Sequence, residues 1–256
     1  MAKWYDRNNP LASRQFTRRN KIALSALLCV AVVVMVAAAY ALPRQEAPEY
    51  TSNYSPPPPT TINYLRVTVL GDSYAAGMGA SSSGAWTRVA ARKSCWSVRL
   101  EAQADTGYVA AGTDRSTAFT DPRKLVDATA NNPELILVQG SISDTGKSGV
   151  YEAAKAVYET LKARAPQASI VVIGPTNAPA IGATENYANR DAIQAAAAQT
   201  GLTFIDPIAL KWLPDPALYA PDQVNLNGKG HRAYADDVLS ALQDSRLTTR
   251  NGCLPA

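Results

Sequence analysis

The stretch VTVLGDSY, residues 67–74, decides the fold of this chain. Its first four residues are apolar or β-branched, which is typical of a buried strand. The run ends abruptly in Gly71-Asp72-Ser73, and a segment rich in Gly, Ala and Ser follows. A buried strand that leads into a tight turn places a serine hydroxyl at the carboxyl end of a sheet, where open α/β folds carry their sites.

The body of the chain, residues 64–256, alternates between strand-like and helix-like segments. We expect strands over Arg66–Leu70, Ser97–Ala104, Leu135–Gln139, Ser169–Ile173 and Leu202–Ile205, and helices over Ala85–Lys93, Pro122–Asn131, Val150–Ala165, Asn186–Thr200 and Gly230–Gln243. Strands that alternate with helices predict a parallel sheet with helices on both faces. The predicted fold class is therefore α/β, a three-layer domain with a doubly wound, mostly parallel sheet.

Three segments precede this body. Residues 1–21 form a polar, basic tail, and residues 22–42 carry no charge. The uncharged run is long enough to cross a hydrocarbon layer of about 30 Å, so it predicts a transmembrane anchor. The positive-inside rule then places the tail in the cytoplasm and the body outside, in a single-pass protein of the cell membrane. The alternative is a signal peptide that is cleaved near Ala41, which would release a secreted protein.

Residues 43–63 contain four consecutive prolines, residues 56–59. Such a run cannot bury a core and favours the extended polyproline II conformation. The segment is therefore interpreted as a linker that holds the body away from the membrane.

Charge and cysteine content narrow the function. The chain has 25 Lys and Arg against 21 Asp and Glu, and much of the basic excess lies in the tail. The body has no basic stripe interleaved with aromatic residues, so nucleic acid is not an expected partner. Cys29 lies in the apolar run, which leaves Cys95 and Cys253 either to form a disulfide outside the cytoplasm or to remain two thiols. Neither has the spacing of a metal site, and we expect no metal or cofactor.

The Gly71-Asp72-Ser73 turn after a strand resembles the first motif of the SGNH (GDSL) hydrolase family, and the resemblance extends over roughly residues 65–242. It implies a flavodoxin-like hydrolase fold in which Ser73 is the nucleophile and its backbone N–H belongs to the oxyanion hole. The second motif of the family provides another backbone donor. Gly107 is the natural candidate, although the glycine of the family can instead be aligned with Ala104.

The last two motifs depart from the family pattern. Ser143, one residue before Asp144, stands where the family has an asparagine side chain that donates to the oxyanion. Asp222 keeps its expected place, but Asn225 occupies the position of the histidine base. A neutral amide cannot accept the serine proton at ordinary pH. His231 is the only histidine, and we interpret it as a structural residue or as a displaced base.

Two functions follow from this resemblance. In the first, the chain is a membrane-anchored, extracytoplasmic serine esterase whose activity is reduced or absent because of Asn225. In the second, it is a pseudoenzyme that binds a glycan, an acyl ligand or a protein partner without turnover. The resemblance implies an acylated small molecule, a lipid or a glycan as substrate or ligand, and the membrane as a partner through residues 22–42.

Overall fold

The computed structural model describes residues 18–41, 64–113 and 116–245, and the chain divides into two compact units, residues 1–58 and 59–256. In the first unit, helix α1 (Arg18–Ala41) contains the segment Ile22–Ala41, with a mean hydropathy of 2.8. This segment is long and apolar enough to cross a membrane, and a signal sequence near the N-terminus would have the same properties. Most of the predicted basic tail, the predicted linker and Cys253 lie outside the described residues, so the Cys95–Cys253 disulfide stays a prediction.

The second unit is built on a five-stranded sheet in the order β2-β1-β3-β4-β5. The strands are β1 (Leu65–Gly71), β2 (Trp96–Ala102), β3 (Leu135–Gln139), β4 (Ser169–Ile173) and β5 (Thr203–Ile205). Every neighbouring pair is parallel. The predicted α/β class with a parallel sheet is therefore confirmed.

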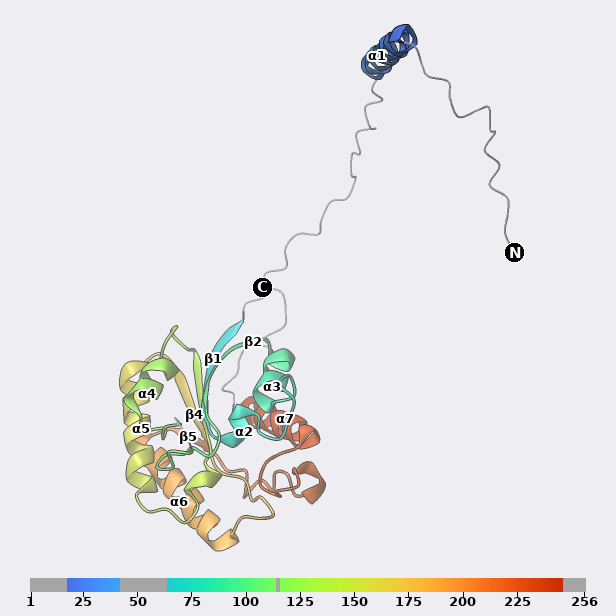
Figure 1. The fold of residues 1–256 in the computed structure, drawn as a ribbon. Helices are drawn as coiled ribbons and strands as arrows, with labels where there is room; N and C mark the ends of the chain where they lie inside the picture. The colour runs from blue at the N-terminus through green and yellow to red at the C-terminus, as the bar shows by residue number, and fades with distance from the viewer. Residues whose placement is uncertain (1–17, 42–63, 114–115, 246–256) are drawn as a thin grey trace, which may run out of the picture. The chain divides into compact units, whose positions relative to one another are not determined.

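Helices cover both faces of this sheet (Figure 1). They are α2 (Ser73–Ala76), α3 (Trp86–Ser94), α4 (Pro122–Ala128), α5 (Val150–Arg164), α6 (Ala183–Thr200) and α7 (Gly228–Asp244), with the short 3₁₀ helices η1 (Ile142–Asp144) and η2 (Pro216–Leu218). Helices α3 and α7 lie on one side of the strands, and α4, α5 and α6 lie on the other. The domain thus has the three predicted layers.

Alternation along the central strands builds two hydrophobic cores, one on each face. In β1, Val69 packs in the cluster that includes Val89 of α3 and Val238 of α7. Its neighbour Leu70 packs in the cluster that includes Leu161 of α5. Burial on both faces explains why the central strands appear in the sequence as continuous apolar runs.

Local hydrogen bonds and backbone angles move some element boundaries away from their predicted positions. Helix α4 ends at Ala128, three residues early, and Asn131 and Asn132 then adopt left-handed φ angles of 63° and 51°. Asparagine tolerates that conformation, so it is suited to such a turn. Helix α7 begins at Gly228 because the Asn227 side chain accepts hydrogen bonds from the backbone N–H groups of the first turn, as an N-cap does.

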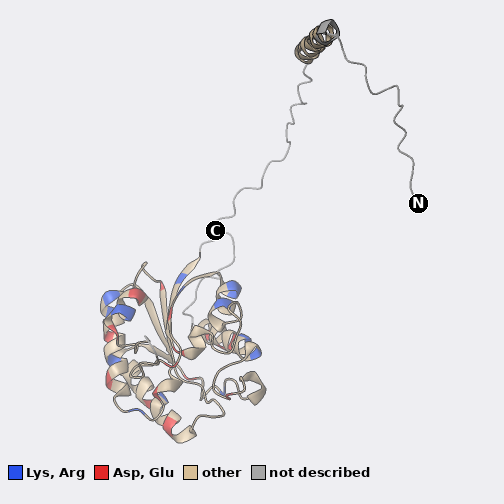
Figure 2. Ribbon diagram, in the orientation of Figure 1, with Lys and Arg blue, Asp and Glu red and all other residues tan. Residues whose placement is uncertain are grey.

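The strand order reverses between β1 and β3, which makes their carboxyl ends a topological switch point. Ser73 lies two residues after the end of β1, and residues 140–144 directly follow β3. Basic and acidic residues are interspersed on the helices around them (Figure 2). The fold therefore brings the Gly-Asp-Ser turn to the edge where open α/β sheets bind ligands.

Candidate active site

The turn after β1 is held by the carboxylate of Asp72. This side chain is 2% exposed and caps α2, because its Oδ1 accepts a hydrogen bond from the Tyr74 N–H at 2.9 Å. Its Oδ2 accepts from the Ile142 N–H at 3.3 Å, which ties the β1 turn to η1. Burial raises the pKa of Asp72 to about 6, against the opposing effect of these hydrogen bonds. Asp72 therefore supports the turn that presents Ser73.

The Ser73 hydroxyl contacts a residue that the sequence analysis did not select. Its Oγ accepts a hydrogen bond from the Asp105 N–H at 2.8 Å and donates one to the Asp105 carboxylate at 3.3 Å. Asp105 is exposed and has a left-handed φ of 58°. Aspartate is one of the few non-glycine residues that adopt this region readily. This preference is the one feature of the sequence that could have indicated a turn at Asp105 beside the site.

Gly107, the predicted backbone donor to the oxyanion, has a different role. Its N–H donates to the Ala110 carbonyl at 2.8 Å and is therefore not free to serve Ser73. A Cβ at Gly107 would collide with the side chains of Asp144 and Ser141, which explains why glycine is needed there. The backbone N–H beside Ser73 belongs to Asp105, and the oxyanion role of Gly107 stays a prediction.

Asp144 fixes the loop that carries Gly107. Its carboxylate is fully buried and accepts hydrogen bonds from the N–H groups of Tyr108 at 2.6 Å, Val109 at 3.1 Å and Ala110 at 2.8 Å. Burial raises the pKa of Asp144, and the three N–H donors act in the opposite direction. Within the described residues the half-buried Ser143 hydroxyl makes no hydrogen bond, so its predicted role as an oxyanion donor stays a prediction.

The loop after η2 brings Asp222 and Asn225 together. Asp222 accepts from the backbone N–H of Val224 at 3.0 Å and of Asn225 at 2.8 Å, and from the Asn225 Nδ2 at 2.7 Å. Burial raises the pKa of Asp222, but these hydrogen bonds outweigh it and leave the pKa below its ordinary value. The Asn225 Oδ1 is buried and has no hydrogen-bond partner in the described part of the chain.

A tyrosine connects this loop to the Ser73 turn. The Tyr74 hydroxyl donates to the Val224 carbonyl at 2.8 Å, so the neighbour of Ser73 contacts the neighbour of Asn225. An Asp that receives a side-chain N–H, next to a serine turn, has the arrangement by which a triad carboxylate orients its base. Asn225 therefore makes the hydrogen bond expected of the base but provides no titratable nitrogen.

His231 is fully buried at the first turn of α7 and uses both ring nitrogens. Its Nδ1 accepts from the Trp86 N–H at 3.3 Å, and its Nε2 lies 2.9 Å from the Met78 carbonyl, to which it must donate. The ring is therefore neutral, and burial lowers its pKa. In this arrangement neither nitrogen is free to take the Ser73 proton, which favours the interpretation of His231 as a structural residue.

Similarity to known proteins agrees with this geometry. Residues 69–233 match the model of the GDSL-like Lipase/Acylhydrolase family. A GDSL lipase of Mycobacterium tuberculosis is 31% identical over 197 residues, which cover 70% of this chain and 83% of that protein. The chain belongs to the GDSL-like lipase/acylhydrolase family.

Solved structures support the fold of this GDSL-like domain. A family two carbohydrate esterase from Clostridium thermocellum, solved with cellohexaose, superposes with a TM-score of 0.59 at 14% identity, over 75% of this chain and 67% of that one. The psychrotrophic esterase EstA from Pseudoalteromonas superposes with a TM-score of 0.55 at 13% identity, over 72% of this chain and 99% of that one. At these identities the likeness shows the shared architecture.

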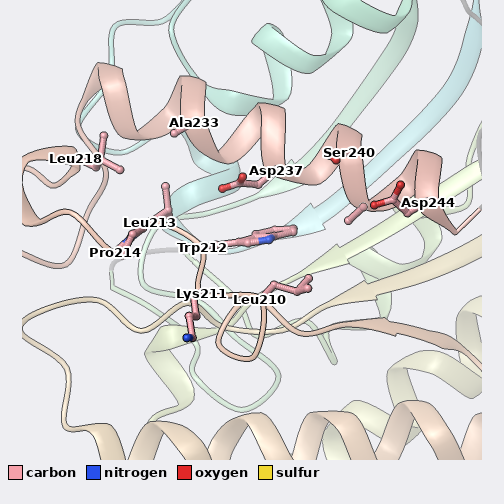
Figure 3. Close-up of a pocket in the computed structure, with 11 residues that line it drawn as sticks. Leu210, Lys211, Trp212, Leu213, Pro214, Leu218, Ala233, Asp237, Ser240 and Asp244 are labelled. Atoms are coloured by element: carbon pink, nitrogen blue, oxygen red, sulfur yellow. The ribbon is translucent and has the colours of Figure 1, made fainter.

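The GDSL-like domain also has a groove of about 390 Å³ between α7 and the loop Leu210–Pro214 (Figure 3). Asp237, Ser240 and Asp244 of α7 face this loop, and the Trp212 ring lies beside Asp237. Neither Ser73 nor the Asp222–Asn225 pair lines the groove, so it is separate from the candidate active site. In the described ranges no group of three or more His, Cys, Asp or Glu side chains is placed to hold a metal ion.

Proposed function

We propose that this chain is a membrane-anchored, extracytoplasmic acyl-ester hydrolase of the GDSL type whose turnover is strongly reduced. The observation that carries the proposal is the pairing of Asp222 with Asn225 beside the Ser73 turn. The pair keeps the hydrogen bond of a catalytic dyad, while the residue in the position of the base is an amide. In this proposal Ser73 is a nucleophile without a proton acceptor.

The proposed chemistry is acyl transfer to Ser73 followed by hydrolysis. The Ser73 Oγ attacks the ester carbonyl, and the negative oxygen that develops is stabilised by the N–H groups of Ser73 and Asp105 and by the Ser143 hydroxyl. Asn225 cannot take the Ser73 proton, because an amide oxygen is not basic at ordinary pH. Loss of the base from a serine triad lowers kcat by about 10⁶ in subtilisin, so a residual rate far below that of an intact triad is expected.

The location and substrate class belong to the same proposal. The apolar segment of α1 follows a basic tail, which supports an anchor with the N-terminus in the cytoplasm and the domain outside. Cleavage near Ala41 would instead give a secreted protein. Substrates are acylated small molecules, lipids or glycans, and the superposition with an esterase solved with cellohexaose supports acylated glycans.

A second candidate function is ligand binding without turnover, as in a pseudoenzyme. It is favoured by the buried Asn225 Oδ1, a hydrogen-bond acceptor without a partner in the described residues. A buried acceptor that is left unpaired costs free energy, and a ligand hydroxyl or amide that donates to it would recover that cost. The ligand would be the glycan or acyl compound that an active relative would cleave, or a protein partner.

Hydrolysis of p-nitrophenyl acetate by residues 59–256, the compact second unit, tests both candidates. Activity in the unmodified protein that disappears in Ser73→Ala would support the hydrolase. Activity only in Asn225→His, with Ser73→Ala in that background as control, would support an intact scaffold that binds without turnover. Absence of Ser73-dependent activity even in Asn225→His would overturn the assignment of Ser73 as a nucleophile.

A further inference from the structure

Asp105 places a carboxylate on the same serine oxygen that its backbone N–H contacts. The N–H lies 2.8 Å from the Ser73 Oγ, and the Oδ1 lies 3.3 Å from it. In acyl transfer, the donors beside the nucleophile face the oxygen that becomes negatively charged. Asp105 therefore supplies both a hydrogen-bond donor, its backbone N–H, and a negative charge, its carboxylate, beside the same serine oxygen.

The backbone conformation holds this carboxylate in place. Asp105 has a φ of 58°, and the next two residues are anchored, since Ser141 donates to the Thr106 carbonyl and Gly107 donates to Ala110. In the described residues the Asp105 carboxylate makes no ion pair, so no cation among those residues is paired with its charge. A developing oxyanion beside Ser73 would therefore meet the negative charge of this carboxylate.

We propose that Asp105 is a specificity-determining residue whose carboxylate disfavours the formation of anions beside Ser73. The carboxylate repels any tetrahedral, negatively charged adduct of Ser73 and leaves room for neutral ligands that donate hydrogen bonds. This inference rests on the proposed role of Ser73 as a nucleophile. It adds an obstacle to turnover that is independent of Asn225, because it acts on the oxyanion and not on the proton.

The same contact suggests a competing role, in which Asp105 replaces the missing imidazole and takes the Ser73 proton. A carboxylate is a weak base for a serine hydroxyl, because efficient general bases have pKa values near the operating pH. Repulsion of the oxyanion is the stronger effect of a charge in this position. The two roles predict opposite signs when the charge is removed, so one experiment separates them.

Boronic acids report this repulsion without turnover. When phenylboronic acid binds, a bond forms between the Ser73 Oγ and boron, the Ser73 hydroxyl proton leaves to solvent, and the tetrahedral boron carries one negative charge. Affinity would be measured by calorimetry on the full-length chain in detergent, for the unmodified protein and for Asp105→Asn and Asp105→Gly. Both replacements tolerate the left-handed backbone, so neither strains the loop.

We expect both variants to bind phenylboronic acid between about fivefold and about a thousandfold more tightly, the range for two unit charges about 4 Å apart in water and near a protein surface. Asp244→Asn, which removes a charge at the far end of α7, is the matched control and should leave the affinity unchanged. Ser73→Ala should abolish binding. Ser73-dependent binding that is equal in all Asp105 variants overturns the inference alone, whereas no binding in any variant overturns it together with the nucleophile assignment.

Turnover gives the second readout. Hydrolysis of p-nitrophenyl acetate by Asn225→His should rise by a similar factor when Asp105→Gly is added. A lower rate in the double variant than in Asn225→His would identify Asp105 as a base and overturn the proposed repulsion.

Discussion

Two sets of polar residues in the second unit differ in how completely they are hydrogen-bonded. The frame, defined as Asp72, Asp144 and His231, is buried, and its polar side-chain atoms all have partners. The reacting positions, defined as Asp105, Ser143 and Asn225, are exposed or half-buried. There, the Ser143 hydroxyl and the Asn225 Oδ1 have no partner in the described residues.

This difference indicates that the frame residues are needed for the stability of the fold, whereas the reacting positions are needed for the proposed activity. A buried carboxylate or imidazole without partners destabilises the fold, so the frame residues must be satisfied whether or not the protein turns over a substrate. The reacting positions are not held in this way, since the Ser143 hydroxyl and the Asn225 Oδ1 have no partner in the described residues. Their replacement can remove activity while the fold persists, which is the state that we propose for this chain.

The largest expected effect is the loss of stability in Asp144→Ala. The substitution leaves three N–H groups of the loop 108–110 without their acceptor, at about 1–3 kcal/mol for each unsatisfied buried group. We expect the free energy of unfolding, measured by urea denaturation, to fall by about 3–5 kcal/mol. Asp222→Ala removes an exposed carboxylate that also accepts several hydrogen bonds and should cost less than half as much; equal losses would contradict the division into frame and reacting positions.

His231→Phe should have the next largest effect. The ring keeps its bulk, but the Trp86 N–H and the Met78 carbonyl lose their partner, at a cost of about 2–4 kcal/mol. The comparison is Asn225→Leu, which removes an amide whose buried oxygen is unpaired and should change stability by less than about 1 kcal/mol. If thermal denaturation ranked the two variants in the reverse order, His231 would not belong to the frame.

The sequence predicted those features of the fold and the site that depend on residues close together in the chain. The alternation of strand-like runs with helix-like segments predicted a parallel sheet with helices on both faces. The position of Ser73 followed from the strand and the turn that precede it, and the spacing of Asp222 and Asn225 placed them in one loop. These features depend on residues that are close together in the chain.

The contacts of Asp105 and His231 depend on distant residues and were not predicted. Asp105 meets Ser73 because β1 and β2 are neighbours in register and because a left-handed turn follows β2. The partners of His231 are 145 and 153 residues away along the chain. Gly107 was the expected donor because the second motif of the family supplies a backbone donor at this place. The lack of space for a Cβ beside Asp144 explains the glycine equally well.

A smaller effect concerns pH. Burial lowers the pKa of His231 below its ordinary value of 6.5, so the unfolded chain binds the proton more readily than the folded one. The contribution of His231 is therefore fully present above about pH 6.5 and is lost as the pH falls toward its folded pKa. Asp72 acts in the opposite direction, because its folded pKa of about 6 exceeds 3.8 and its protonation below pH 6 favours the folded state.

His231→Phe isolates the first of these two opposing effects. The stability difference between the unmodified protein and this variant should shrink as the pH is lowered from 7 to 5 in urea denaturation experiments, because only the unmodified protein carries the imidazole. A difference that stays constant over this interval would mean that His231 titrates alike in the folded and unfolded chains, contrary to its burial.

The smallest expected effect is a difference in pKa between two imidazole rings of the same variant. In Asn225→His the new ring would lie beside the exposed Asp222 carboxylate, which favours the charged form, whereas His231 is buried between backbone groups that hold it neutral. Because His231 is the only histidine of the chain, NMR titration of the variant should show two ring signals and resolve them without ambiguity. We expect the new signal to titrate at higher pH than that of His231, and Asp222→Asn should lower its pKa. Coincident titrations would mean that the 222–225 loop does not position a base, and the scaffold would then be less intact than the Asp222–Asn225 hydrogen bond indicates.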